Sequence, residues 1–115
     1  MREVQNAIIE SATITQSERD FLTFYITVKL QNGFNQSFGG HSLFLRDRKS
    51  DHFNKKTFTG YYISECLDVA GVGEWDQLIG KTIRVDGDNI GIYGIGHIIN
   101  DKWFYPEKLW GEEND

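Results

Sequence analysis

FLTFYITVKL, residues 21–30, has the most regular alternation of apolar and polar side chains in the chain. Successive side chains of an extended strand point to opposite faces, so every second residue shares a face. β-branched and aromatic residues, which favour strands, are also frequent here. One face carries only large apolar side chains, namely Leu22, Phe24, Ile26, Val28 and Leu30. We therefore predict the central strand of an antiparallel sheet, with this face against the core.

A first strand is predicted over residues 4–15, which a polar turn joins to the central strand as a hairpin. Ile8, Ala12 and Ile14 fall on one side of it, and Glu10 interrupts that side. We expect the side that carries the three apolar residues to face the core.

A third strand is predicted after Asn32 and Gly33, which tolerate positive φ and favour a tight turn. Phe34, Gln36 and Phe38 alternate there with Asn35 and Ser37. Gly39 and Gly40 then break the strand or form a bulge before the extended chain continues.

A helix is predicted over residues 59–70, where apolar side chains recur at helical spacing and Gly71 supplies the stop. The preceding segment, 46–56, has the charged composition of an exposed loop. Residues 74–78 predict one further helical turn that carries Trp75 and Leu78 inward.

A second hairpin is predicted from residues 81–86 and 90–100, and an aromatic segment, 102–106, closes the domain. Gly91, Gly94 and Gly96 in the second arm leave gaps on the sheet surface or allow it to bend. The order of strands, helix and strands predicts an α+β domain over 1–106, with an antiparallel sheet of two hairpins plus an extra strand packed against one main helix. Residues 107–115 are expected to form an acidic, flexible tail.

Length and charge limit the classes of function. The chain has 115 residues, enough for one domain with its own core. Its net charge of -5 argues against the basic face of a duplex nucleic-acid-binding protein, but a small anionic ligand remains compatible with it. The single cysteine, Cys66, excludes an internal disulfide. With no secretory pattern and no apolar run that could span a membrane, we expect a cytoplasmic protein.

Residue types that carry out catalysis or bind metals do not form a recognisable pattern. His41, His52, His97 and Cys66 are scattered, without the spacing of metal ligands. Cys66 falls on the apolar stripe of the predicted helix, where a buried thiol is the ordinary role. No serine lies in a G-x-S-x-G elbow. We expect no metal, no cofactor and no enzymatic activity.

Aromatic residues and nearby cations give the most informative functional pattern. Trp103, Phe104 and Tyr105 are consecutive, and Arg84, Lys102 and the basic 46–56 segment supply cations. Aromatic rings stack on nucleobases while arginine or lysine pairs with phosphate. The alternative is that the rings of residues 103 and 104 close the open end of the core. Gly39 and Gly40 likewise offer backbone amides to an anion, or form a bulge without a ligand.

Three stretches are similar to a family of small proteins that recur in phages and prophages. They are FGGHSL at 38–43, the segment from GVGEW to GKTIRV at 71–85, and IGHIINDKWFYP at 95–106. The resemblance implies a small cytoplasmic phage product. Small phage proteins of this kind resemble host-defence antagonists, either sponges that trap cyclic nucleotides or cyclic ADP-ribose derivatives, or anti-CRISPR proteins that cover a defence complex.

From both lines of reasoning we expect a non-enzymatic protein that sequesters a nucleotide-derived immune signal, at a pocket shared between subunits of a homo-oligomer. The alternatives are an acidic inhibitor that binds a host defence protein, and a small nucleotide-processing enzyme. Arg84→Ala is expected to weaken anion binding and leave the fold intact. The expected ligand-binding residues are Gly39, Gly40, His41, Arg46, Tyr61, Arg84, His97, Lys102, Trp103 and Phe104.

Overall fold

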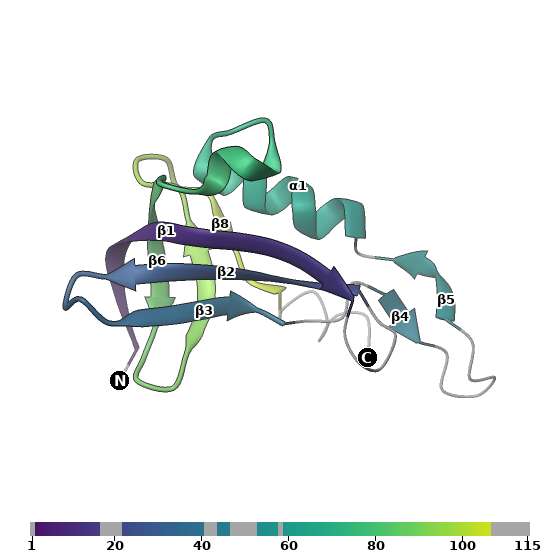
Figure 1. Cartoon of the computed structure of the whole chain (residues 1–115), viewed down its shortest axis with the longest axis horizontal. Coiled ribbons are helices and arrows are strands. Elements are labelled where there is room, and N and C mark those ends of the chain that lie inside the picture. The colour runs from purple at the N-terminus through teal and green to yellow at the C-terminus, as the bar shows by residue number, and fades with distance from the viewer. Residues whose placement is uncertain (1, 17–21, 41–43, 47–52, 58, 107–115) are drawn as a thin grey trace.

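A computed structural model describes residues 2–16, 22–40, 44–46, 53–57 and 59–106 of the chain (Figure 1). The predicted acidic tail over 107–115 lies outside the described residues. The elements are β1 (Glu3–Gln16), β2 (Leu22–Leu30), β3 (Asn35–Gly39), β4 (Phe44–Arg46), β5 (Phe53–Thr57), α1 (Thr59–Ala70), the 3-10 helix η1 (Trp75–Leu78), β6 (Thr82–Gly87), β7 (Ile92–Gly96) and β8 (Trp103–Phe104).

A six-stranded antiparallel sheet in the order β3-β2-β1-β6-β7-β8 packs against α1, which confirms the predicted α+β class. β1 belongs to both halves of this sheet. Its first part pairs with β6, and its second part runs along β2 after a bend (Figure 1). The sheet curves so far that β3 approaches the β6–β7 turn, where Gln36 Nε2 donates a hydrogen bond to the Asp88 carbonyl oxygen over 2.9 Å.

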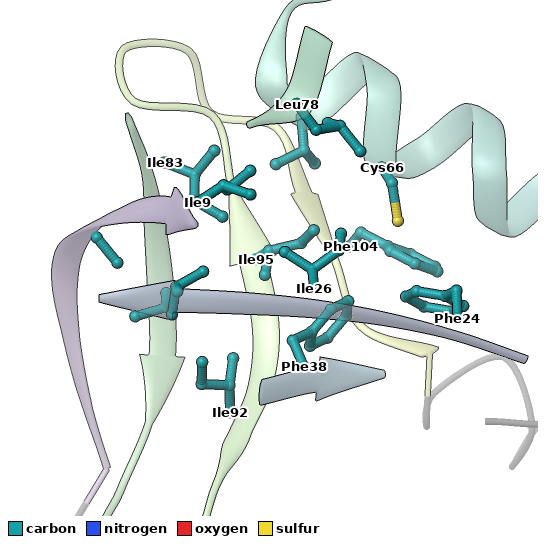
Figure 2. Packing of buried hydrophobic residues seen from close by; sticks show 14 of the residues in the cluster. Ile9, Phe24, Ile26, Phe38, Cys66, Leu78, Ile83, Ile92, Ile95 and Phe104 are labelled. Atoms are coloured by element: carbon teal, nitrogen blue, oxygen red, sulfur yellow. The ribbon is translucent and has the colours of Figure 1, made fainter. Parts of the chain in front are cut away.

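β2 alternates as predicted, because Phe24, Ile26 and Val28 are fully buried against the helix. α1 has the predicted bounds and ends at Gly71, whose φ of 72° is the left-handed conformation that glycine adopts at helix ends. Figure 2 shows Cys66 of α1 directed toward the rings of Phe24 and Phe104. No helix in the described ranges is long and apolar enough to cross a membrane.

The predicted inner face of β1 was wrong at two of its three apolar residues. Ile14 is 43% exposed, whereas Ala12 packs against the core. Ile8 is 49% exposed, and its neighbours Ala7 and Ile9 enter the core instead. The cause is a bulge between Ile9 and Ser11, where the register to β2 shifts. Glu10 is the extra residue of this bulge. Side chains that face the core are therefore two residues apart before the bulge and three residues apart across it.

Two short strands, β5 and β8, were missed by the sequence patterns. The 46–56 segment was predicted as a loop, but β5 begins there. It pairs with β4, which falls on the extended chain predicted after Gly40, as a separate two-stranded sheet. The arm predicted over 90–100 ends at Gly96, and a turn returns the chain to β8 on the free edge of β7. This last strand brings the aromatic segment onto the sheet.

Candidate functional site

The outer face of β6, β7 and β8, on the side away from the core, has two rows of matched residues. In one row Arg84 of β6 pairs with Gly96 of β7, which pairs with Trp103 of β8. In the next row Asp86 pairs with Gly94, and Tyr105 follows on the same side of the chain as residue 103. Each row therefore places a charged residue and an aromatic residue on either side of a glycine.

The two aromatic rings lie across these glycines. A Cβ atom added at Gly96 would lie 2.6 Å from Cδ2 of Trp103, and one added at Gly94 would overlap the Tyr105 ring. The ring centres of Trp103 and Tyr105 are 5.9 Å apart, and their planes differ by 25°. Two nearly parallel rings on the flat surface left by glycine make an aromatic platform, which we define as Trp103 and Tyr105.

Arg84 borders the platform on the side of Trp103. Its guanidinium carbon lies 4.9 Å from the centre of that ring. Nε donates a hydrogen bond to the His97 carbonyl oxygen over 2.7 Å, and Nη2 donates to the Asn100 carbonyl oxygen over 2.8 Å. These bonds hold the guanidinium in a fixed position beside the indole. Within the described ranges no carboxylate forms an ion pair with Arg84, so its charge remains available to an anion.

Asp86 borders the platform on the side of Tyr105 and carries the opposite charge. It accepts a 2.6 Å hydrogen bond from the Tyr105 hydroxyl and forms an ion pair of 2.9 Å with Arg2. Burial, followed by the hydrogen bond to Asp86, raises the pKa of Tyr105 to about 12. The guanidinium of Arg2 also lies 4.7 Å from the ring centre of Tyr93. The two ends of the platform therefore differ. Among the described residues, Arg84 at one end has no carboxylate partner, and Arg2 at the other end is paired with Asp86.

The structure brings together three of the residues predicted from sequence, Arg84, His97 and Trp103. His97 lies in the turn between β7 and β8, where Nδ1 accepts hydrogen bonds from the backbone N–H groups of Ile99 and Asn100 at 3.1 and 3.0 Å. The imidazole thereby shapes the turn whose carbonyl oxygens hold Arg84. We assign it a positioning role beside the platform.

Three other predicted residues lie on the helix side of the sheet, away from the platform. Phe104 is 3% exposed and belongs to the core, so it is not accessible to a ligand. Tyr61 is 51% exposed on α1, with its ring centre 6.1 Å from that of Phe104. Lys102 pairs with Glu65 of α1 at 2.7 Å, and this hydrogen bond raises the pKa of the lysine. The interpretation of ring 104 as part of the core was the correct alternative.

Gly39 and Gly40 end β3 and have positive φ, 120° and 81°. The Gly40 N–H donates to the Phe24 carbonyl oxygen over 2.7 Å, so this amide is not free for an anion. A Cβ at Gly39 would overlap the same carbonyl oxygen, which explains why glycine is needed there. His41 lies outside the described residues, and at Arg46 only the backbone, in β4, is described.

Sequence reasoning missed Arg2, Asp86, Tyr93 and Tyr105 as neighbours of the site. A signal for the platform was present, because Trp103 and Tyr105 are two residues apart, as are Gly94 and Gly96. Residues two apart in a strand share a face, so two large rings in one strand can lie over two glycines in the neighbouring strand. This spacing indicates that the segments 94–96 and 103–105 pair.

No metal site is formed by the part of the chain that the structure describes, since no three or more His, Cys, Asp or Glu side chains are suitably grouped there. Comparison of the sequence with protein-family models and with curated proteins finds no match.

Proposed function

We propose that the protein is a non-enzymatic binding protein that holds a nucleotide-derived ligand on the aromatic platform. A base stacks on the rings of Trp103 and Tyr105, and a phosphate pairs with Arg84. The observation that carries the proposal is the Arg84 guanidinium, which has no carboxylate partner among the described residues and lies 4.9 Å from the centre of an indole that lies flat on the sheet. Base stacking on an aromatic side chain contributes about 1–3 kcal/mol, and a nearby arginine supplies the charge for phosphate.

The preorganisation of Arg84 supports this function over a purely structural role. Two carbonyl oxygens hold the guanidinium through Nε and Nη2, and within the described ranges no hydrogen bond occupies Nη1. An arginine fixed in this way loses little side-chain entropy when an anion binds. The available N–H groups lie beside the ring on which the base stacks.

The platform offers one open side, so a bound nucleotide would remain half exposed on a single chain. Sites for small molecules usually bury most of the ligand surface. A second copy of the chain facing the platform would provide the missing wall, and we include a homo-oligomer in the proposal. In line with the resemblance to small phage proteins, the biological role proposed is to sequester a cyclic nucleotide or a cyclic ADP-ribose derivative in the host cytoplasm and thereby antagonise host defence.

Isothermal titration calorimetry against cyclic mononucleotides, cyclic dinucleotides and cyclic ADP-ribose isomers tests the proposal. We expect saturable binding that weakens with salt, because exposed charges are screened. Trp103→Leu keeps an apolar side chain over Gly96 but removes the stacking surface, and should abolish binding. Arg84→Lys, which retains the charge, should weaken binding less than Arg84→Gln.

Lys102→Gln and Tyr61→Leu are matched controls, because they remove a cation and an aromatic ring away from the platform. Both should bind like the wild type. Binding that is lost in these variants and kept in Trp103→Leu would place the site elsewhere. Recovery of a chemically altered ligand would indicate the nucleotide-processing enzyme instead, and no binding together with co-purification of a host protein would indicate the inhibitor.

A further inference from the structure

A second site lies at the end of the curved sheet, on the inner side and away from the platform. A cavity of about 620 Å³ opens between the start of β1, the β2–β3 turn and the β6–β7 turn. Figure 1 shows the β6–β7 turn at the end of these two strands that is farther from α1, and no described residue of α1 lines the cavity. The volume falls within the range of about 300–1,000 Å³ that is typical of small-molecule sites.

The described walls of this cavity, which we call the end cavity, are rich in amide side chains and contain no lysine or arginine. Gln5, Asn32, Gln36 and Asn89 contribute amides, each of which carries both a donor and an acceptor. Asn35 also borders the cavity, but its side chain is on the outer face of β3. Among the described lining residues, Glu3 and Asp88 are the only charged ones. Such a wall repels phosphates and carboxylates, and it favours a ligand that both donates and accepts hydrogen bonds.

Two of these amides are held in place by hydrogen bonds to their oxygen atoms, which leaves their N–H donors available. Gln5 Oε1 accepts from the Gln31 N–H, and Asn32 Oδ1 accepts from the Phe34 N–H. Among the described residues, no hydrogen bond occupies the amide nitrogen of Gln5 or Asn32. The carboxylate of Asp88 accepts from two backbone N–H groups of the β6–β7 turn, which lower its pKa, and therefore keeps the turn in shape.

The backbone of β3 adds further hydrogen-bonding groups to the cavity. Leu30 N–H donates to the Phe34 carbonyl oxygen, and Gly40 N–H donates to that of Phe24. These two bonds show which residue pairs of β2 and β3 are hydrogen-bonded to each other and which are not, because the two kinds alternate along an antiparallel ladder. By this alternation the backbone groups of Asn35 and Ser37 point away from β2. The Ser37 hydroxyl is hydrogen-bonded to that of Thr27 on the outer face, yet Ser37 lines the cavity. It must therefore do so with its backbone, which means that the open edge of β3 borders the cavity.

An aromatic ring completes the rim. Phe34 is 71% exposed and borders the cavity opposite Ile90 of the β6–β7 turn. A flat apolar ring beside a set of amides and carboxylates suits a molecule that has hydroxyl groups around its edge and C–H groups on its face. Sugar rings have this chemistry, and they carry no charge that the acidic lining would repel.

We propose that the end cavity binds a neutral, hydroxyl-rich ligand of one or two sugar rings. Amide side chains and the edge of β3 bond its hydroxyl groups, and Phe34 packs against its C–H face. This site is separate from the platform in position, and its lining has the opposite charge.

Titration followed by ¹H–¹⁵N NMR, with maltose, cellobiose and N,N′-diacetylchitobiose as probes, tests this proposal. At least one probe should give saturable shifts of the backbone amides of Asn32, Asn35 and Asn89. Phe34→Ala should weaken that binding about tenfold, the usual effect of losing one aromatic contact. Because Phe34 is 71% exposed, Phe34→Ala should fold like the wild type, and Asn89→Ala in the exposed turn gives a second, independent variant.

Glucose 6-phosphate and spermidine serve as charged probes of similar size range, and Trp103→Leu serves as the control variant. Binding of the sugar should persist in Trp103→Leu, so that failure at the platform and failure at the end cavity are distinguishable. The absence of saturable shifts with all three sugars would overturn the proposal. Shifts of the same amides that saturate with spermidine or with the phosphate, and not with the sugars, would also overturn it.

Discussion

Gly96→Ala is the sharpest test of how the platform is built. Gly96 does not have a positive φ, so alanine meets no backbone strain there. The nearest obstacle is the indole, because the new Cβ would lie 2.6 Å from Cδ2 and 2.7 Å from Cε2 and Cε3 of Trp103. Ordinary carbon–carbon contacts are about 3.5–4.0 Å, so the ring must move away by roughly 1 Å.

The expected cost follows from two opposing effects. Forcing one extra methyl group into a packed position costs about 1–3 kcal/mol. Replacing glycine by alanine in a strand returns roughly 0.5–1 kcal/mol, because the unfolded chain loses conformational freedom. We therefore expect a net loss of stability of about 0.5–2 kcal/mol with Trp103 present.

A double-mutant cycle isolates the contact with the ring. In a Trp103→Ala background the obstacle is gone, and Gly96→Ala should become neutral or stabilising. The coupling energy between the two positions should be about 1–3 kcal/mol. Urea unfolding followed by far-UV circular dichroism measures each variant, since this signal does not depend on the tryptophan that is removed.

Gly91→Ala is the matched control, because this glycine lies in the same hairpin, lacks a positive φ and has no atom within 4 Å of an added Cβ. Its effect should stay within about 0.5 kcal/mol in either background. Additive effects of the substitutions at positions 96 and 103 would mean that the indole does not lie on Gly96, and the platform as described would be wrong.

Four further outcomes are expected. Arg84→Gln should leave the protein folded but lower the free energy of unfolding by about 1–3 kcal/mol, because two loop carbonyl oxygens lose charge-assisted bonds. A urea midpoint equal to that of the wild type would contradict this. Ile26→Asp should prevent folding, judged by circular dichroism, since an unpaired charge would enter a fully buried position. The pKa of Tyr105 is raised from 10.0 to about 12, so its contribution to stability is complete below pH 10 and is lost as the pH rises toward 12. Over this range the urea midpoint of Tyr105→Phe should therefore fall less steeply than that of the wild type. Burial raises the pKa of Cys66, so a thiol reagent should label it only at the rate of unfolding, and rapid labelling of the native protein would contradict the packing.

The strongly periodic elements could be predicted from the sequence because local pattern and burial agree in them. β2 and α1 each bury one regular face, and no irregularity interrupts either. β1 differs because the bulge at Glu10 changes the face on which later residues lie. A shift of one residue reverses every side chain of a strand, so a single undetected bulge was enough to misplace Ile8.

The short strands could not be predicted because their existence depends on partners distant in the sequence. β8 has two residues, and only its pairing with β7 makes it a strand. The same pairing sends Phe104 inward and its two neighbours outward. Without it, residues 102–106 read as one aromatic cluster, and the predicted site combined side chains from both faces of the sheet.

The two-sided pairing of β1 has a consequence for the order in which the protein is completed during synthesis. The second half of β1 can pair with β2 soon after both are synthesised. The first half pairs with β6, where Ile8 lies opposite Thr82 and Glu3 opposite Gly87, so this pairing must follow the synthesis of β6. Until β6 has left the ribosome, the first half of β1 has an unpaired edge, and the part of the core that β6 and β7 complete stays exposed to water. Stalled or truncated products are therefore expected to recruit other chains at that edge, which makes prompt release of the full-length polypeptide important for its solubility.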